Sequence, residues 1–256
     1  MAQMDSIAGL DPLRPITPQI TQLLRARIIK NHLAPGNRIS ETEIASTYNV
    51  SRQPVREAFI KLQEQGLLTV LPQRGTFVSK IAYQAVLDAQ FLREAIEADI
   101  LLILASAPPK GLVANLRQQL ETQRALGPND AETFIQLDET FHRTLAEAAG
   151  KGGAWKQIEG LKSQMDRVRF LAMKQFPVDK LIRQHGQMVD ALEQQNPTLA
   201  QRTLRQHLRE VLSDLPIIIK ALPDLFDLPD GKMPAPLNTP LPGSRPTSKG
   251  KSNDAA

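Results

Sequence analysis

The chain has 256 residues, enough for two domains with separate hydrophobic cores. Apolar residues make up 41%, and neither a membrane-spanning apolar run nor a signal peptide stands out, so we expect a soluble, cytoplasmic protein. The absence of cysteine excludes disulfides and thiolate metal sites.

The net charge of +4 lies entirely in the first third of the chain. Residues 1–80 contain ten Lys and Arg against six Asp and Glu, whereas residues 81–220 and 221–256 are each neutral. A basic small domain beside a neutral larger one favours a polyanionic partner for the first domain alone. So small an excess also arises by chance, so this interpretation needs support from motifs.

The first 80 residues carry the pattern of a small DNA-binding domain. Residues 1–15 are expected to be flexible, and helical periodicity begins at Ile16. Three helices and a two-stranded hairpin are then predicted, over residues 16–33, 41–48 and 51–65, and over 67–71 and 76–79. This order is that of a winged helix-turn-helix, which we place at residues 16–80.

The third predicted helix has two arginines on its polar face. Arg52 and Arg56 are four residues apart and therefore point the same way, and arginine can bind guanine O6 and N7 with two hydrogen bonds. Gln53 could contact adenine or a phosphate, and Arg74 and Gly75 suit the tip of a wing. The alternative for any one of these arginines is an ordinary solvated helix face.

Several motifs in this segment resemble the DNA-binding domain of the GntR family. They occur in order at Pro35–Ile39, Val50–Ala58, Leu62–Leu67 and Pro72–Val78. The resemblance implies DNA contacts by the two arginines and the wing glycine. The full set of expected DNA-binding residues is Arg38, Ser51, Arg52, Gln53, Arg56, Arg74 and Gly75. Thr42 stands where some fatty-acid-responsive relatives carry a DNA-contacting arginine, which implies a different operator sequence.

The rest of the chain reads as mainly α, with a helical domain over residues 81–222. Six helices are predicted, over residues 83–107, 111–126, 130–149, 154–175, 178–195 and 197–221. The joints are short, so neighbouring helices should run antiparallel as a bundle. Seven of the last 34 residues are proline, and we expect residues 223–256 to form a disordered tail.

Three of the four histidines lie in the helical domain. Asp138 and His142 are four apart on one predicted helix, and His185 and His207 lie on two later helices. One carboxylate and three imidazoles from three helices can meet at one zinc, nickel, manganese or iron ion. From spacing alone, ordinary core or surface histidines remain an alternative.

The same residues resemble the FCD domain, the sensor of the FadR-type subfamily. The resemblance is carried by Leu137–Leu145, His185–Leu192 and His207–Leu208, and by Phe91–Glu97, which resembles the opening helix. It implies one divalent metal per chain, with zinc as the expected ion, held by Asp138, His142, His185 and His207. It also implies that Arg93 helps to bind an effector. Lys151 departs from the family's usual asparagine at a helix end, which leaves the ligand set intact.

A metal and an arginine together form a cationic pocket that suits a small carboxylate effector, such as a sugar acid, hydroxy acid or dicarboxylate. Arg167 and Arg169 are further candidates to line it, with a solvated helix surface as the alternative for each. We therefore expect a transcription regulator, as a rule a repressor in this family, that binds double-stranded operator DNA as a homodimer. The alternatives are a metal-dependent enzyme and an architectural DNA-binding protein with a purely structural metal.

Overall fold

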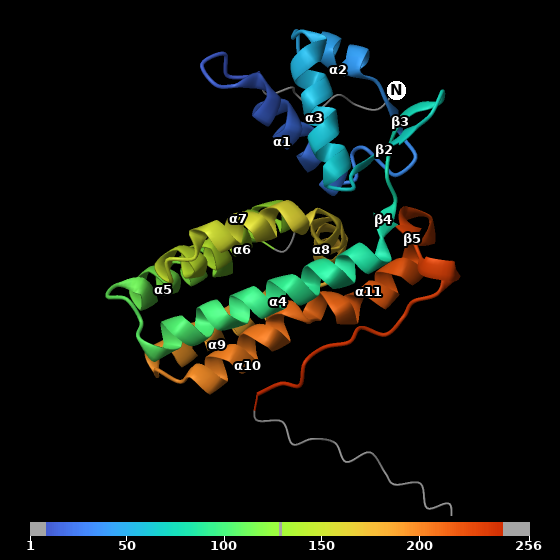
Figure 1. Cartoon of the computed structure of the whole chain (residues 1–256). Coiled ribbons are helices and arrows are strands. Elements are labelled where there is room, and N and C mark those ends of the chain that lie inside the picture. The colour runs from blue at the N-terminus through green and yellow to red at the C-terminus, as the bar shows by residue number, and fades with distance from the viewer. Residues whose placement is uncertain (1–8, 128–129, 243–256) are drawn as a thin grey trace, which may run out of the picture.

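The computed structural model describes residues 9–127 and 130–242. The first part forms the expected helix-turn-helix with a wing (Figure 1). Its elements are α1 (Ile16–Ile29), β1 (Arg38–Ile39), α2 (Glu41–Thr47), α3 (Arg52–Glu64), β2 (Leu68–Leu71) and β3 (Gly75–Val78). The wing is a three-stranded antiparallel sheet in the order β1-β3-β2, because β1 pairs with β3 through Arg38 and Phe77. The sequence predicted only the hairpin.

This domain has its own core, as the length of the chain allowed. The three helices bury their apolar faces together with the inner side of the wing. The fully or nearly fully buried members include Ile20, Leu24, Ile28, Val55, Phe59, Leu62, Leu67 and Val78. Burial of each such side chain contributes roughly 1.5–3 kcal/mol, so the domain does not depend on the rest of the chain for its core.

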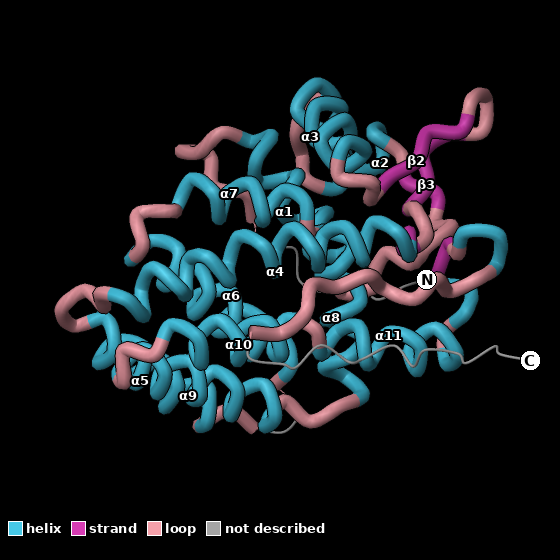
Figure 2. Tube along the Cα trace, turned by 60° about the horizontal axis from the view of Figure 1, so that its bottom comes forward, coloured by secondary structure: helices cyan, strands magenta, loops and turns pink. Residues whose placement is uncertain are grey.

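The second part is an all-helical bundle, as expected, but among the described residues it has eight helices rather than six. They are α4 (Tyr83–Ser106), α5 (Leu112–Arg124), α6 (Ala131–Ala148), α7 (Gly152–Leu161), α8 (Ser163–Gln175), α9 (Asp179–Glu193), α10 (Pro197–Leu208) and α11 (Glu210–Ala221). The long α4 runs the length of the bundle, beside α10 (Figures 1 and 2). No described helix is both long and apolar enough to span a membrane.

Two predicted helices are each divided in the structure, at Lys162 and at Arg209. No glycine or proline marks the break at Arg209, and Gly160, two residues before the break at Lys162, still lies within α7. Each division lets consecutive helices pack on different neighbours: α7 packs on α4 and α6, whereas α8 also packs on α1 and α11. The breaks therefore follow from tertiary packing, which local sequence does not report.

The prediction of disorder from residue 223 is wrong for residues 223–242, and residues 243–256 lie outside the described part. After the three residues of η1 (Pro223–Leu225), the short β5 (Phe226–Asp227) pairs in parallel with β4 (Ile81–Ala82), and η2 (Pro229–Gly231) follows. Phe226 is buried beside Ile81 and Tyr83. The segment is held by these tertiary contacts, despite its proline content.

Candidate functional site

The exposed face of α3 carries the residues expected to contact DNA. Val55, Ala58, Phe59 and Leu62 are buried, and this orients Ser51, Arg52, Gln53 and Arg56 toward solvent. The Arg52 guanidinium lies 3.3 Å from Glu41 on α2, in a pair that is largely exposed and so costs little to break. Gln53 donates a hydrogen bond to Glu57 at 3.1 Å.

The wing brings Arg38 and Arg74 to one end of the small sheet. Gly75 has φ +109°, which favours glycine, and a β-carbon there would lie 3.0 Å from Nε of Arg38. Arg38 and Arg74 are both exposed. The hairpin projects from the domain (Figure 2), so its tip is free to approach a nucleic-acid backbone. All seven residues expected to bind DNA are thus exposed or partly exposed on the surface of this one small domain.

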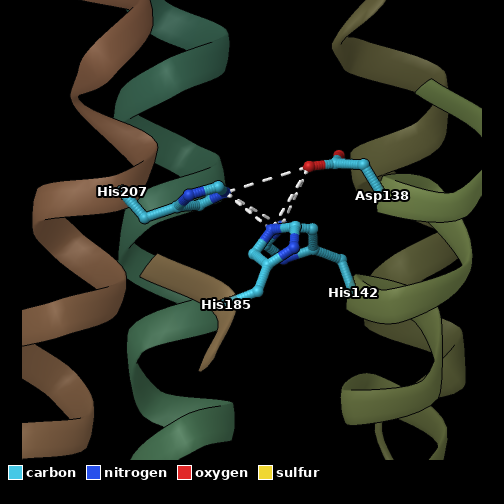
Figure 3. Close-up of side chains that lie close together, drawn as sticks. All are labelled: Asp138, His142, His185 and His207. Atoms are coloured by element: carbon cyan, nitrogen blue, oxygen red, sulfur yellow. Dashed lines mark hydrogen bonds and ion pairs between the residues drawn. The ribbon is translucent and has the colours of Figure 1, made fainter. Parts of the chain in front are cut away.

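A buried cluster of one carboxylate and three imidazoles lies in the helical bundle (Figure 3). Asp138 and His142 come from α6, His185 from α9 and His207 from α10, and their candidate ligand atoms lie within 4.8 Å of one another. Nε2 of His207 is 3.2 Å from Nε2 of His142 and 3.3 Å from Nε2 of His185. Asp138 Oδ1 lies 3.4 Å from Nε2 of His185.

The Nδ1 atom of each imidazole lies close to a side-chain oxygen atom on the side of the ring that faces away from the cluster. Nδ1 of His142 lies 2.5 Å from Glu97 Oε2, that of His185 lies 2.9 Å from Gln123 Oε1, and that of His207 lies 3.1 Å from Gln184 Oε1. The two glutamine oxygens accept, so Nδ1 of His185 and Nδ1 of His207 donate. The Nε2 atoms of the three rings face the same small volume.

This donor set fits a divalent metal. Bonds of about 2.0–2.1 Å from zinc to nitrogen place neighbouring ligand nitrogens about 3.0–3.4 Å apart, which matches the spacing of the Nε2 atoms. Asp138 Oδ1 is buried and has no hydrogen-bond partner, so a cation would also satisfy it. With no soft ligand, the set suits zinc, nickel, manganese or iron.

The electrostatics keep these groups in their ligating forms. Burial lowers the pKa of His185 and, together with His185 and His142, lowers the pKa of His207 well below its ordinary value, so both imidazoles are neutral. Burial alone would raise the pKa of Asp138, but the Arg169 guanidinium and the imidazoles outweigh it and hold that pKa well below its ordinary value. The carboxylate is therefore ionised.

A cavity of about 520 Å³ adjoins the cluster. Arg93, Asp138, Arg169 and His207 line it, together with apolar side chains of α8 and the α8–α9 connection. Its size is that of a small-molecule site. The lining also includes charged residues of both signs: Asp179, Lys180, Arg183, Glu210 and Asp214. The Nη2 atom of Arg93 is buried with no hydrogen-bond partner among the described residues, so it can receive an anionic guest.

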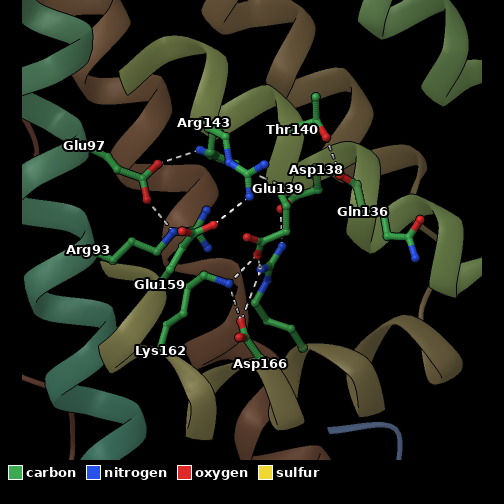
Figure 4. A network of polar contacts seen from close by, with 12 residues as sticks. Arg93, Glu97, Gln136, Asp138, Glu139, Thr140, Arg143, Glu159, Lys162 and Asp166 are labelled. Carbon is green, nitrogen blue, oxygen red and sulfur yellow. Dashed lines mark hydrogen bonds and ion pairs between the residues drawn. The ribbon is translucent and has the colours of Figure 1, made fainter. Parts of the chain in front are cut away.

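Of the three arginines expected to bind an effector, two line this cavity. Arg93 also donates through Nε to Glu97 (Figure 4). Arg169 pairs with Asp138 Oδ2 and with Glu139 at 3.1 Å. Arg167 does not line it. It is buried at the junction of the domains, where Nη1 donates to the carbonyl oxygen of Ser79 at 2.9 Å, and burial lowers its pKa to about 10. The alternative of a solvated surface is wrong for both Arg167 and Arg169, which are 2% and 8% exposed.

The sequence analysis missed the residues behind the imidazoles. Glu97, Gln123 and Gln184 are on α4, α5 and α9, far apart in sequence. One signal was present for Glu97, since it follows Arg93 by four residues on the same helix. No local pattern marks either glutamine, because only the packing of the bundle brings it to a histidine.

Comparisons with known proteins agree with this architecture. Residues 16–78 match the family described as bacterial regulatory proteins, gntR family, and residues 88–210 match the FCD domain. The HTH-type transcriptional repressor RspR of Escherichia coli (strain K12) is 40% identical over 204 residues, which cover 79% of this chain and 90% of that protein. A probable D-xylose utilization operon transcriptional repressor of Paenarthrobacter nicotinovorans is 28% identical, over 77% of this chain and 87% of its own.

Among solved structures, E. coli McbR/YncC has the same fold, with a TM-score of 0.67. It is 19% identical and covers 81% of this chain and 99% of its own. The two relatives from Escherichia coli and Paenarthrobacter nicotinovorans are both named as transcriptional repressors.

Proposed function

This chain belongs to the gntR family of bacterial regulatory proteins and carries an FCD domain, and from that premise we propose that it is a metal-dependent, effector-responsive transcription repressor. Its winged domain reads operator DNA, and its helical domain holds one divalent ion, with zinc as the expected metal. A small carboxylate bound between that ion and Arg93 changes operator affinity. The site of action is the cytoplasm, where bacterial operators lie.

One observation carries the sensor part of this proposal. Three imidazoles bring their Nε2 atoms together beside a buried carboxylate oxygen that has no hydrogen-bond partner. A cation bound at the centre would satisfy that oxygen and the nitrogens at once. In the adjoining cavity, the unpaired Nη2 atom of Arg93 supports an anionic group of the ligand beside the ion.

Two copies of the chain are proposed to bind a pseudo-palindromic operator, because each winged domain offers a single recognition helix. The exposed face of α4 supports a contact between copies. Four large apolar side chains on it are 37–49% exposed: Phe91, Leu92, Leu102 and Ile103. Phe91 and Leu102, like Leu92 and Ile103, are eleven residues apart, about three helical turns, so each pair shares one face.

The metal is tested by elemental analysis of the protein purified without chelator. About one divalent ion per chain is expected in the wild type. His185→Ala removes a ligand, and loss of a ligand weakens a site by more than the 10–100-fold typical of a supporting residue, so this variant should be empty. Zinc binding should raise the Tm of the helical domain, because its ligands tie three helices together.

His32→Ala is the matched control, since His32 lies exposed in the winged domain and should leave the metal content unchanged. Metal-free wild type, or equal metal in the His185 variant, would refute the site. The effector is tested by thermal shift with gluconate, lactate and succinate as probes of three carboxylate classes. A metal-loaded protein that no anion stabilises, and whose operator affinity none changes, would instead indicate a purely structural metal.

A further inference from the structure

The carboxylate of Glu97 lies between a ligand of the metal cluster and an arginine of the cavity. Glu97 is 3% exposed and lies on α4, one turn after Arg93. Its Oε1 accepts a hydrogen bond from Nε of Arg93, and its Oε2 lies 2.5 Å from Nδ1 of His142 (Figure 4 labels Arg93 and Glu97). Both carboxylate oxygens are therefore engaged, one by a residue of the cavity and one by a metal ligand.

This contact differs from those behind the other two imidazoles. Nδ1 of His185 and Nδ1 of His207 donate to amide oxygens of glutamines, whereas Nδ1 of His142 lies 2.5 Å from an oxygen of a carboxylate. A carboxylate behind a metal-binding histidine fixes the tautomer and the ring orientation and makes Nε2 a stronger donor to the metal. His142 is also stacked against Trp155, which limits how far its ring can turn.

We propose that Glu97 is a positioning residue of this site, holding His142 as a metal ligand while it anchors the head group of Arg93 beside the cavity. The inference rests on the proposed metal centre and goes beyond it by assigning a residue outside the ligand set. Glu97 does not touch the ion; it acts through His142.

A simpler role for Glu97 would be to neutralise a buried arginine. Glu94 provides the comparison, because it is on the same helix, is 4% exposed and also pairs with arginines. Its partners are Arg205 at 2.7 Å and Arg209, whose Nε donates to it at 2.8 Å, and it contacts none of the four candidate ligands. A variant at either position loses a buried carboxylate that pairs with arginine. Only a variant at Glu97 also loses the contact with His142, a candidate metal ligand.

The test measures metal affinity in the full chain. Wild type, Glu97→Gln and Glu94→Gln are stripped with chelator and titrated with Zn²⁺ against a chromogenic competitor, and with Co²⁺ by visible absorption. Glu97→Gln should weaken Zn²⁺ binding about 10–100-fold, the usual effect of removing such a partner, and should alter the Co²⁺ spectrum. In the glutamine variant, an NH₂ group replaces one of the two carboxylate oxygens, and this group cannot accept a hydrogen bond. Either Arg93 or His142 therefore loses its partner. Glu94→Gln should keep wild-type affinity and the wild-type spectrum.

Circular dichroism of the stripped proteins checks that they fold. If Glu97→Gln does not, Glu97→Asp keeps the charge and should bind Zn²⁺ more weakly than wild type but still measurably. Wild-type affinity in Glu97→Gln and Glu97→Asp, or an equal loss in Glu94→Gln, would overturn the positioning role while leaving the metal centre standing. A wild type that takes up neither Zn²⁺ nor Co²⁺ would overturn the metal centre itself.

Discussion

At the scale of single residues, burial decides which arginines are free to act. Arg52 and Arg56 stay exposed at the start of α3 because the opposite face of that helix is apolar and buried. Arg93 and Arg169 are buried instead and are held by carboxylates. The same side chain is thus available for a flexible contact with DNA in one domain and is fixed beside a cavity in the other.

Arg52→Ala and Arg56→Ala should each weaken specific operator binding about ten- to a hundredfold, because a lost guanine contact costs about 1–3 kcal/mol. Their Tm should not change, since neither side chain is buried. Binding can be measured by fluorescence anisotropy on an operator selected from random duplexes. Lys156→Ala, an exposed cation on α7, is the control and should bind as wild type does. Wild-type affinity in both arginine variants would show that α3 does not read the operator.

At the scale of elements, the segment after α11 ties the two ends of the helical domain together. β5 pairs with β4, which follows the wing, and the Tyr83 hydroxyl donates to the carbonyl oxygen of Pro234 at 2.8 Å. Arg209, at the break between α10 and α11, donates to the carbonyl oxygen of Thr239 at 2.7 Å. The segment therefore lies across the start of α4 and along α10.

Phe226→Ala should destabilise the protein by about 3 kcal/mol, because it empties a buried position beside Ile81 and Tyr83. For a domain of this size that lowers the Tm by about 6–12 °C, measurable by calorimetry. Leu237→Ala, in the same segment but 92% exposed, should change the stability by less than about 0.5 kcal/mol. Equal Tm values for the two variants would mean that the segment does not pack as described.

Helix α8 contacts both the cavity and the winged domain. Met165 and Arg169 line the cavity. On the side facing the winged domain, Asp166 pairs with Arg25 of α1 at 2.6 Å, and Gln164 donates to the carbonyl oxygen of Gly66 at 2.6 Å. All of these side chains are buried or partly buried, so a change in the cavity that moves α8 must also be accommodated at the winged domain.

At the scale of the whole molecule, polar contacts rather than a shared apolar core join the two domains. Arg25→Ala removes the ion pair with Asp166, which still has Lys162 as a partner at 2.8 Å, so the loss should be confined to the interface. We expect the winged domain to unfold as a separate, earlier transition in calorimetry, with about 1–3 kcal/mol less stability. Arg27→Ala on the same helix should unfold as wild type does, because Arg27 makes no ion pair among the described residues. An unchanged transition in Arg25→Ala would contradict this view of the interface.

Assembly can be tested on the exposed face of α4. Leu92→Lys with Ile103→Lys places charges in an apolar contact and should convert the proposed dimer into monomers in analytical ultracentrifugation, with weaker operator binding. Leu161→Lys, at a leucine on α7 that is 57% exposed, should remain dimeric. A dimeric double variant would place the contact between copies elsewhere on the chain.

Much of this protein could be predicted from its sequence alone. Helical periodicity and turn residues determined the winged domain and the mainly α class, because these depend on residues near one another in the chain. The resemblance of the motifs implied the family, which the family models match. Spacing made Asp138, His142, His185 and His207 candidates, the resemblance implied that they share one metal, and the structure brings them together. Tertiary structure alone decided the breaks at Lys162 and Arg209, the ordered segment after α11 and the placement of Arg167 at the domain junction. It also decided that Glu97, Gln123 and Gln184 support the imidazoles. These features depend on contacts between residues distant in sequence, and no local pattern records which of them will meet.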